Sequence, residues 1–269
     1  MSRSRSKRSP LVLCYHAVDS DWDSHLSIPE ELFIAHMTAL RKRGYRGLTF
    51  VEVERLRRAS DLPERSVVVT FDDGYAKRMM RCKRILDTVG FPATVFVVTS
   101  FVDSGQPMCW PGVEKWAHKT PREMQPLGWT ALRELVGAGW EVGSHTVSHP
   151  VLADLDDGAL SEQLAASRLR IVEELGACET IAYPYGVADE RVATAAEAAG
   201  YLAGCTLKPA HRLDEPYRRS RVGLFSHDRG LRQWAKLSPT VGRLRRTRLA
   251  EALEPFHVRH RKAPARPTA

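Results

Sequence analysis

Short apolar runs alternate with amphipathic stretches along most of this chain. Seven runs rich in β-branched and aromatic residues have the length of buried strands, at residues 11–15, 67–71, 93–98, 140–143, 180–183, 202–206 and 221–225. Six stretches carry apolar residues at helical spacing, at residues 29–43, 50–58, 77–89, 130–138, 157–175 and 191–199. Strands that alternate with helices indicate a parallel sheet, either open or closed into a barrel. The pattern predicts an α/β fold with about seven parallel strands.

Residues 103–128 interrupt this alternation. They contain three glycines and four prolines, together with Trp110 and Trp116. Long loops inside compact domains are often functional. Two interpretations of the tryptophans are open: they stack on a sugar ring, or they are buried in a lid over the barrel wall.

Charge is concentrated at the two ends of the 269-residue chain, whose net charge is +8. Residues 1–10 contribute +4 and residues 241–269 contribute +6, so residues 11–240 carry about −2. Basic ends can contact anionic lipid or nucleic acid, but basic segments of this kind are more often solvated tails. We expect one folded domain over residues 11–240 between two partly disordered tails. We expect no nucleic-acid partner and at most weak contact of the tails with an anionic membrane.

The composition also bears on the compartment. No run approaches the roughly 18 apolar residues of a membrane span, and a strand-like run follows the basic N-terminus where a signal peptide would have its apolar region. The five cysteines are scattered and form no C-x-x-C pair. A disulfide framework or a thiolate zinc site is therefore not expected, and a cytoplasmic, reducing setting is the prediction.

Asp72 and Asp73 follow the apolar run 67–71 and precede Gly74. The C-terminal ends of parallel strands are where α/β folds place their chemistry. Neighbouring carboxylates repel each other, so a cation beside them would favour their ionised forms. A strand followed by an ordinary Asp-Gly turn is the alternative without chemistry.

A second signal is the pair His145 and His149, in the sequence His-Thr-Val-Ser-His. This spacing lets two imidazoles face one way in a helical turn and bind one metal ion, although a strand-end histidine and a loop histidine give the same pattern. Asp73, His145 and Tyr185 each follow the end of a predicted strand, and parallel strands bring such positions to one rim. The rim is therefore predicted to hold a mononuclear metal, with Asp72 and Asp73 supplying a ligand and a general base.

These segments resemble the motifs of the NodB-homology polysaccharide deacetylases. Thr-Phe-Asp-Asp-Gly at residues 70–74 matches the first motif, residues 145–149 match the second, and Tyr-Pro-Tyr-Gly at residues 183–186 looks like the third. The resemblance spans about residues 11–225. It implies a distorted (β/α) barrel of seven strands. It also implies an enzyme that removes N-acetyl groups from amino sugars, or O-acetyl groups from xylan, with zinc or a similar divalent ion.

Carried over by position, the resemblance implies that Asp72 is the general base. It implies that Asp73, His145 and His149 bind one divalent metal ion. Zinc is the expected ion, and cobalt, nickel or iron(II) suit the same ligands. The backbone N–H of Tyr185 would help to bind the oxyanion.

Two departures from the family pattern concern the base and the acid. Where many members have an arginine that pairs with the base, this chain has Ala182, so another residue must tune the base. The late motif that supplies the acid is matched poorly by residues 224–227. The opening Tyr15-His16 pair is similar to that of the subgroup acting on poly-N-acetylglucosamine. We therefore expect His16 to be the general acid, with His227 or a purely hydrogen-bonding role for His16 as alternatives.

The expected function is metal-dependent removal of acetyl groups from an N-acetylated amino sugar, oligosaccharide or polysaccharide. A cytoplasmic enzyme would act on a lipid-linked or small glycoside precursor. One alternative is hydrolysis of a non-sugar amide at the same rim. Another is a barrel that binds glycan without turnover, for which Ala182 is the main support.

Overall fold

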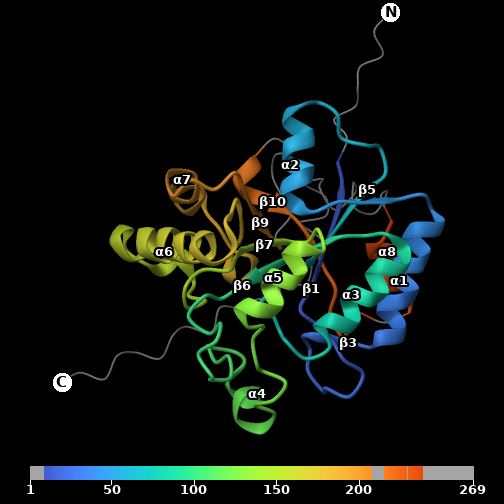
Figure 1. Ribbon diagram of the computed structural model, residues 1–269, viewed down its shortest axis with the longest axis horizontal. Coiled ribbons are helices and arrows are strands. Elements are labelled where there is room, and N and C mark those ends of the chain that lie inside the picture. Colours follow the sequence, from blue (N-terminus) through green and yellow to red (C-terminus); the bar gives the residue numbers. More distant parts are fainter. Residues whose placement is uncertain (1–8, 208–214, 229, 239–269) are drawn as a thin grey trace, which may run out of the picture.

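The computed structural model describes residues 9–207, 215–228 and 230–238, in which helices surround a large parallel sheet (Figure 1). The sheet order is β10-β9-β8-β7-β6-β5-β1-β11, with β4 beside β5. Its strands are β1 (Leu11–Tyr15), β4 (Arg46–Gly47), β5 (Ser66–Phe71), β6 (Ala93–Val97), β7 (Glu141–Ser144), β8 (Thr180–Ala182), β9 (Ala203–Thr206), β10 (Arg219–Ser220) and β11 (Val222–Gly223). A separate parallel pair consists of β2 (Ala17–Val18) and β3 (Ser27–Ile28).

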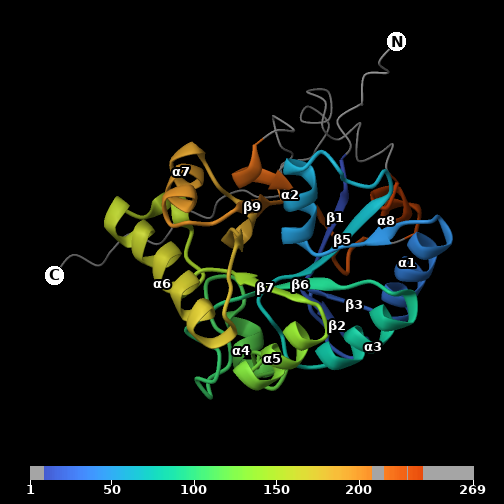
Figure 2. The same ribbon diagram turned by 45° about the horizontal axis from the view of Figure 1, so that its top comes forward.

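The helices lie between the strands in chain order and around the sheet (Figure 2). They are α1 (Glu30–Lys42), α2 (Phe50–Arg58), α3 (Met79–Val89), α4 (Glu114–Lys119), α5 (Trp129–Gly137), α6 (Asp157–Leu175), α7 (Glu190–Ala198) and α8 (Leu231–Lys236), with short 3₁₀ segments η1 (Leu152–Asp154), η2 (Pro184–Gly186) and η3 (Pro216–Arg218). Among the described residues, none of these helices is both long and apolar enough to cross a bilayer.

One short segment nearly closes the sheet into a barrel. Arg219 and Ser220 pair with β9 at one edge, and Val222 and Gly223 pair with β1 at the other edge. Only Arg221 lies between these two strands. The expected α/β class and parallel barrel are confirmed, but the expected count of seven strands is too low for the barrel. The additional strand, β10, has two polar residues and joins the sheet through its backbone, so no apolar run announces it.

Alternation along the strands separates two apolar layers. Leu13 and Val69 belong to the large cluster that also contains residues of the outer helices. Val12 and Val68, one position earlier, belong to a second cluster. That second cluster fills the barrel interior, and its other members are Leu48, Phe50, Val53, Leu62, Phe96, Ala182, Ala203 and Cys205. Even-numbered positions of β1 and β5 therefore face the barrel interior. The same alternation determines which side chains at the ends of these strands point inward.

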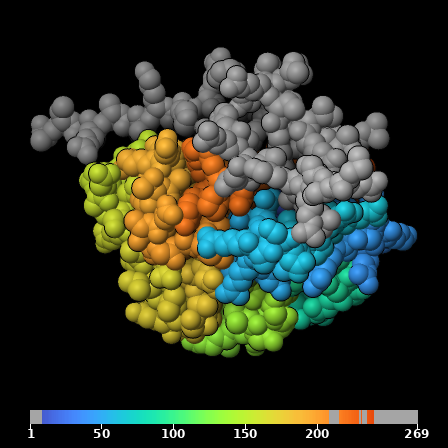
Figure 3. Space-filling model, turned by 90° about the horizontal axis from the view of Figure 1, so that it is seen from above, coloured from blue at the N-terminus to red at the C-terminus, as the bar shows by residue number. Residues whose placement is uncertain are grey.

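Helix α2 closes the end of the barrel at which the strands begin. Phe50 and Val53 enter the interior cluster, and the first two N–H groups of the helix donate to Thr94 Oγ1 and Glu141 Oε2, each at 2.9 Å. A helix N-terminus has unsatisfied donors, so these bonds seat α2 on the barrel. In space-filling view, the blue surface around α2 meets the orange surface of later residues (Figure 3). Arg58 Nη2, at the end of α2, donates to Leu202 O at 3.0 Å.

The excursion after β6 forms a third apolar cluster of its own. It buries Trp110 and Trp116 together with residues that include Trp22, Tyr75 and Met108. The structure therefore supports the interpretation that the tryptophans are buried, and does not support the interpretation that they stack on a sugar ring. The excursion also contains α4, which the glycine- and proline-rich sequence did not predict.

Most of the predicted basic tails lie outside the described residues, since residues 1–8 and 239–269 are not among them. The domain boundaries at residues 10 and 240, and the weak membrane contact of the tails, stay predictions.

Candidate metal and acid–base site

Two adjacent carboxylates at the end of β5 point to different neighbours. Asp72 continues the inward parity of β5, and its N–H donates to Tyr15 O at 2.9 Å. Strict alternation would send Asp73 to the other face, but Asp73 has φ 69° and Gly74 has φ 78°. A left-handed non-glycine residue is strained, and such strain is concentrated at functional sites. This turn lets both carboxylates lie at the rim.

The two motif histidines come from the loop after β7. His145 N donates to Val97 O at 2.8 Å, and its Nδ1 lies 2.7 Å from Ala182 O. His149 N donates to Thr146 Oγ1 at 3.0 Å. Thr146 and His149 have φ 72° and 62°, so the segment is not the helical turn that the spacing suggested. Left-handed residues bend the loop and bring the imidazoles together instead.

Asp73, His145 and His149 form a buried group whose ligand atoms all lie within 4.8 Å of one another. Asp73 Oδ1 is 3.4 Å from His145 Nε2 and 3.6 Å from His149 Nε2. Among the described residues this buried oxygen has no hydrogen-bond donor. A buried carboxylate oxygen without a partner is costly, and two imidazoles with one carboxylate are a common zinc donor set. The three side chains could therefore hold a divalent metal.

Electrostatics within this group favour cation binding. Burial lowers the pKa of His149 to about 3, so its imidazole is neutral at pH 7. Burial also acts to lower the pKa of His145, but Asp73, Asp72 and the Ala182 carbonyl together raise it, and the net shift is upward. Imidazoles bind metals in their neutral form. Asp73 favours the protonated form of His145. A metal ion bound by Asp73 and His145 would therefore displace that proton.

Asp72 is paired with Arg221, the residue at the seam of the barrel. Arg221 Nη1 and Nη2 donate to Asp72 Oδ1 and Oδ2 at 2.6 and 2.7 Å, and the arginine side chain is fully buried. Arg221 Nη1 also donates to Thr70 Oγ1 at 2.9 Å. Burial acts to raise the pKa of Asp72, but Arg221 and His145 hold it well below its usual range. Asp72 is therefore an oriented carboxylate at neutral pH.

Sequence reasoning did not identify Arg221. It noticed that the arginine expected to pair with the base is replaced by Ala182, and left the partner open. In the structure Ala182 is fully buried inside the barrel, and the guanidinium of Arg221, between β10 and β11, reaches Asp72 instead. The one sequence signal was a charged residue at the start of an otherwise apolar run.

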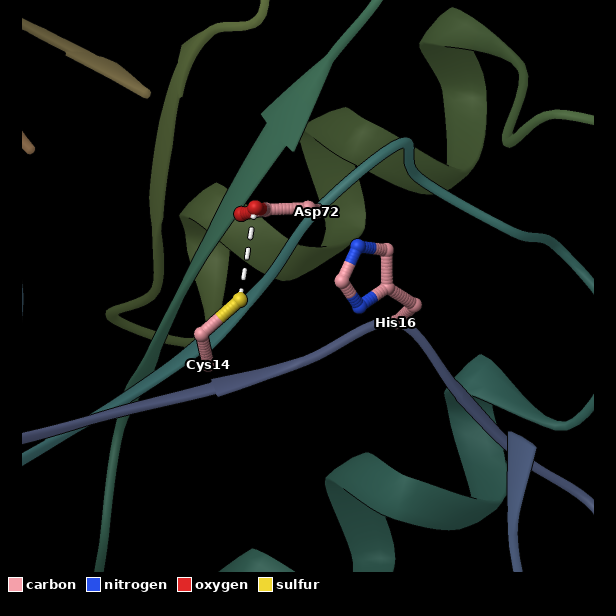
Figure 4. Close-up of side chains that lie close together, drawn as sticks. All are labelled: Cys14, His16 and Asp72. Carbon is pink, nitrogen blue, oxygen red and sulfur yellow. Dashed lines mark hydrogen bonds between the residues drawn. The ribbon is translucent and has the colours of Figure 1, made fainter. Parts of the chain in front are cut away.

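Cys14 and His16 lie beside Asp72 (Figure 4). Cys14 Sγ donates to Asp72 Oδ2 at 3.3 Å, and burial raises the pKa of this thiol well above its usual value. His16 is 9% exposed, and its Nδ1 has no hydrogen-bond partner among the described residues. Candidate ligand atoms of all three residues lie within 4.8 Å of one another. Because Arg221 already occupies both oxygens of Asp72, this second group suits proton transfer better than metal binding.

The remaining predicted residues differ in position. Tyr185, in η2 after β8, has φ 58° and sets its ring edge-on to His149 with centroids 4.7 Å apart. It therefore lies beside the group formed by Asp73, His145 and His149. His227 stacks on Phe225 at 5.5 Å, and Phe225 in turn lies 5.6 Å from the ring of His16. Of the two candidate acids, His16 is the one that the structure brings beside Asp72.

Comparisons with known proteins agree on the family of this site. The polysaccharide deacetylase family model matches residues 59–204. The chain is 28% identical to YxkH of Bacillus subtilis, a protein named for the same family, over 201 residues that make up 74% of this chain and 64% of that protein. It is 25% identical to the poly-β-1,6-N-acetyl-D-glucosamine N-deacetylase of Staphylococcus aureus, over 68% of this chain and 61% of that enzyme. The chain thus spans less than two thirds of the length of these relatives.

Solved structures show the same fold. The deacetylase PplD of Streptococcus pyogenes superimposes with a TM-score of 0.72 at 21% identity, over 85% of this chain and 98% of that one. IcaB of Ammonifex degensii superimposes with a TM-score of 0.70 at 25% identity, over 87% of this chain and 97% of that one. The family-model match includes both carboxylates and both histidines of the rim, whereas His16 and Arg221 lie outside it.

Proposed function

This chain belongs to the polysaccharide deacetylase family, and from that premise we propose that it is a metal-dependent hydrolase that removes acetyl groups from an N-acetylated amino sugar in an oligosaccharide or polysaccharide. One observation carries the proposal: the two adjacent carboxylates have different partners. Asp73 faces two imidazoles, and Asp72 faces a guanidinium. The two carboxylates can therefore have different roles: Asp73 can hold a cation, and Asp72 can accept a proton.

Asp73, His145 and His149 would hold the divalent ion, with zinc as the expected metal. When bound, such an ion polarises the acetyl carbonyl and makes a neighbouring water more acidic. Asp72 would take the proton of the attacking water as general base. Arg221 keeps Asp72 ionised and fixes both of its oxygens.

Two further groups would complete the hydrolysis. The backbone N–H of Tyr185 would donate to the oxyanion that develops on the acetyl oxygen. His16 would give a proton to the departing amine as the C–N bond breaks. The water oxygen remains on the acetyl carbon, so the products are acetate and a free amino sugar.

The relatives support the substrate class. The S. aureus relative is named as an N-deacetylase of poly-β-1,6-N-acetyl-D-glucosamine. Arg221 also weakens the main argument for a barrel without turnover, because it supplies the cation beside Asp72 that Ala182 does not.

Acetate release from N-acetylglucosamine oligomers tests the proposal directly. We expect purified protein to release acetate from these oligomers, a chelator to abolish the release, and added zinc to restore it. Acetyl esters serve as a second substrate class, and His145→Ala as a variant without the metal site. Turnover of simple amides alone would favour the non-sugar amidase. Glycan binding without acetate release, with zinc bound, would favour the non-catalytic barrel.

The identity of the acid is tested by His16→Gln beside His227→Gln. We expect His16→Gln to lower kcat by about 10²-fold or more, because the leaving amine then lacks its proton donor. His227→Gln is the matched control and is expected to retain most of the activity. Acetate release over a range of pH is the measurement, and the reverse ranking of the two variants would assign the acid to His227.

A further inference from the structure

The two histidines of the metal-ligand group are held in different ways. His145 Nδ1 lies 2.7 Å from Ala182 O, so a backbone carbonyl can orient its ring. His149 is only 5% exposed, yet its Nδ1 has no hydrogen-bond partner among the described residues. Metal-binding histidines almost always donate their second ring N–H to a carboxylate, carbonyl or water. No carboxylate or carbonyl group of the described residues makes this outer contact with His149.

Aromatic rings occupy the surroundings of His149 instead. Trp110 stacks on its imidazole with centroids 4.2 Å apart and planes 20° from parallel. The ring of Tyr185 meets it edge-on, with centroids 4.7 Å apart. Tyr185 Oη donates to Pro111 O at 3.1 Å, so Tyr185 is tied to the residue that follows Trp110. These contacts form a closed clamp, consisting of Trp110, Pro111 and Tyr185, around one metal-ligating side chain.

We propose that this aromatic clamp positions His149 for the metal. The inference rests on the proposed function, since it concerns the metal site of that hydrolase. A flat indole against the imidazole opposes rotation of the ring and keeps Nε2, 3.6 Å from Asp73 Oδ1, turned toward the carboxylate.

The clamp is expected to act on affinity as well as on packing. An imidazole bound to a divalent cation is electron-poor, and the face of a tryptophan attracts positive charge. The stack on Trp110 is then stronger in the loaded site than in the empty one. Trp110 thus favours the bound state.

The clamp also assigns a role to the excursion after β6. Trp110 is 6% exposed, lies in the cluster with Met108 and Val113, and meets Phe101 edge-on at 5.7 Å. The excursion thereby supplies a rigid support for the metal ligand, rather than an open surface for the sugar.

Zinc affinity of the purified full-length chain, measured by competition with a chromophoric chelator, tests the proposal. We expect Trp110→Leu to weaken zinc binding about 10-fold or more, the usual effect of losing an outer contact, and Trp110→Phe, which keeps a ring, to weaken it by less than about 3-fold. Trp116→Leu is the matched control. Trp116 is 7% exposed in the same cluster and has no ring contact with His149, so its loss should leave zinc affinity unchanged.

A second variant keeps the test decisive if Trp110→Leu does not fold. Tyr185 is 40% exposed, so Tyr185→Leu removes the other half of the clamp with little loss of packing, and it should also weaken zinc binding. Wild-type affinity in Trp110→Leu or Tyr185→Leu, or an equal loss in Trp116→Leu, would overturn the clamp alone. If the wild-type chain binds no zinc, while His145→Ala behaves identically, the proposed metal-dependent function fails as well.

Discussion

Asp72→Asn is expected to lower kcat for acetate release by about 10²- to 10⁴-fold, the usual contribution of a general base. The amide has nearly the same shape as the carboxylate but cannot take a proton from water. In the wild-type chain Arg221 donates to both oxygens of Asp72, and the amide of asparagine keeps one of these two acceptors, so the side chain should stay near its wild-type position. The loss should therefore appear in kcat rather than in substrate binding.

Zinc content separates this effect from loss of the metal. Asp72→Asn should bind zinc as the wild-type chain does, because Asp72 does not belong to the Asp73, His145 and His149 group. Asp73→Asn is the matched variant one residue away, and it should lose zinc and activity together. An Asp72→Asn protein that retains more than a tenth of wild-type kcat would assign the base to another residue.

Arg221→Leu is expected to lower the free energy of unfolding at pH 7 by about 3–5 kcal/mol, the range found when one partner of a buried ion pair is removed. The Asp72 carboxylate would be left buried without its cation. The same variant should also lose most of its activity, since the base would be neither oriented nor held ionised. Urea unfolding monitored by fluorescence and circular dichroism gives the stability.

The dependence of this loss on pH has a definite sign. The pKa of Asp72 is lowered in the folded wild-type chain, so the stabilising contribution is complete above the unfolded-state value of about 4 and is lost as pH falls below it. The stability difference between wild type and Arg221→Leu should therefore be largest near neutral pH and shrink on acidification.

Two controls accompany Arg221→Leu. Asp87→Asn breaks the exposed Lys83–Asp87 pair on α3, 2.8 Å long, and should cost at most about 0.5 kcal/mol. Adding Asp72→Ala to Arg221→Leu removes both charges and should recover part of the lost stability. A single Arg221→Leu variant as stable as the Asp87→Asn control would show that the pair contributes little.

Local patterns in the sequence were sufficient for most of the elements and for the class of fold. All seven predicted strands occur in the barrel, because runs such as Val67–Val69 can be buried on both faces only in a parallel sheet covered by helices. The prediction that strand ends converge on one rim needs no distances, because parallel strands all point one way. On that ground the sequence also placed Asp73, His145 and Tyr185 together.

Other features depend on contacts between residues far apart in the chain. Asp72 and Arg221 are 149 positions apart, and they meet only because the segment from β10 to β11 closes the barrel. In the sequence, nothing connects Ala182, which stands where an arginine was expected, with Arg221. The folded barrel connects them, because it brings Arg221 to the carboxylate that the missing arginine would have paired with.

Fine geometry at the rim was likewise decided by the tertiary structure. The histidine spacing suggested a helical turn, whereas left-handed residues in a loop bring His145 and His149 together. The tryptophans of the excursion left burial and sugar stacking open, and packing of Trp110 against His149 settled its place. Sequence periodicity reports which face of a strand or helix is apolar, because that depends on neighbours within a few residues. It does not report which ring or guanidinium arrives from another element, because that depends on how the whole barrel closes.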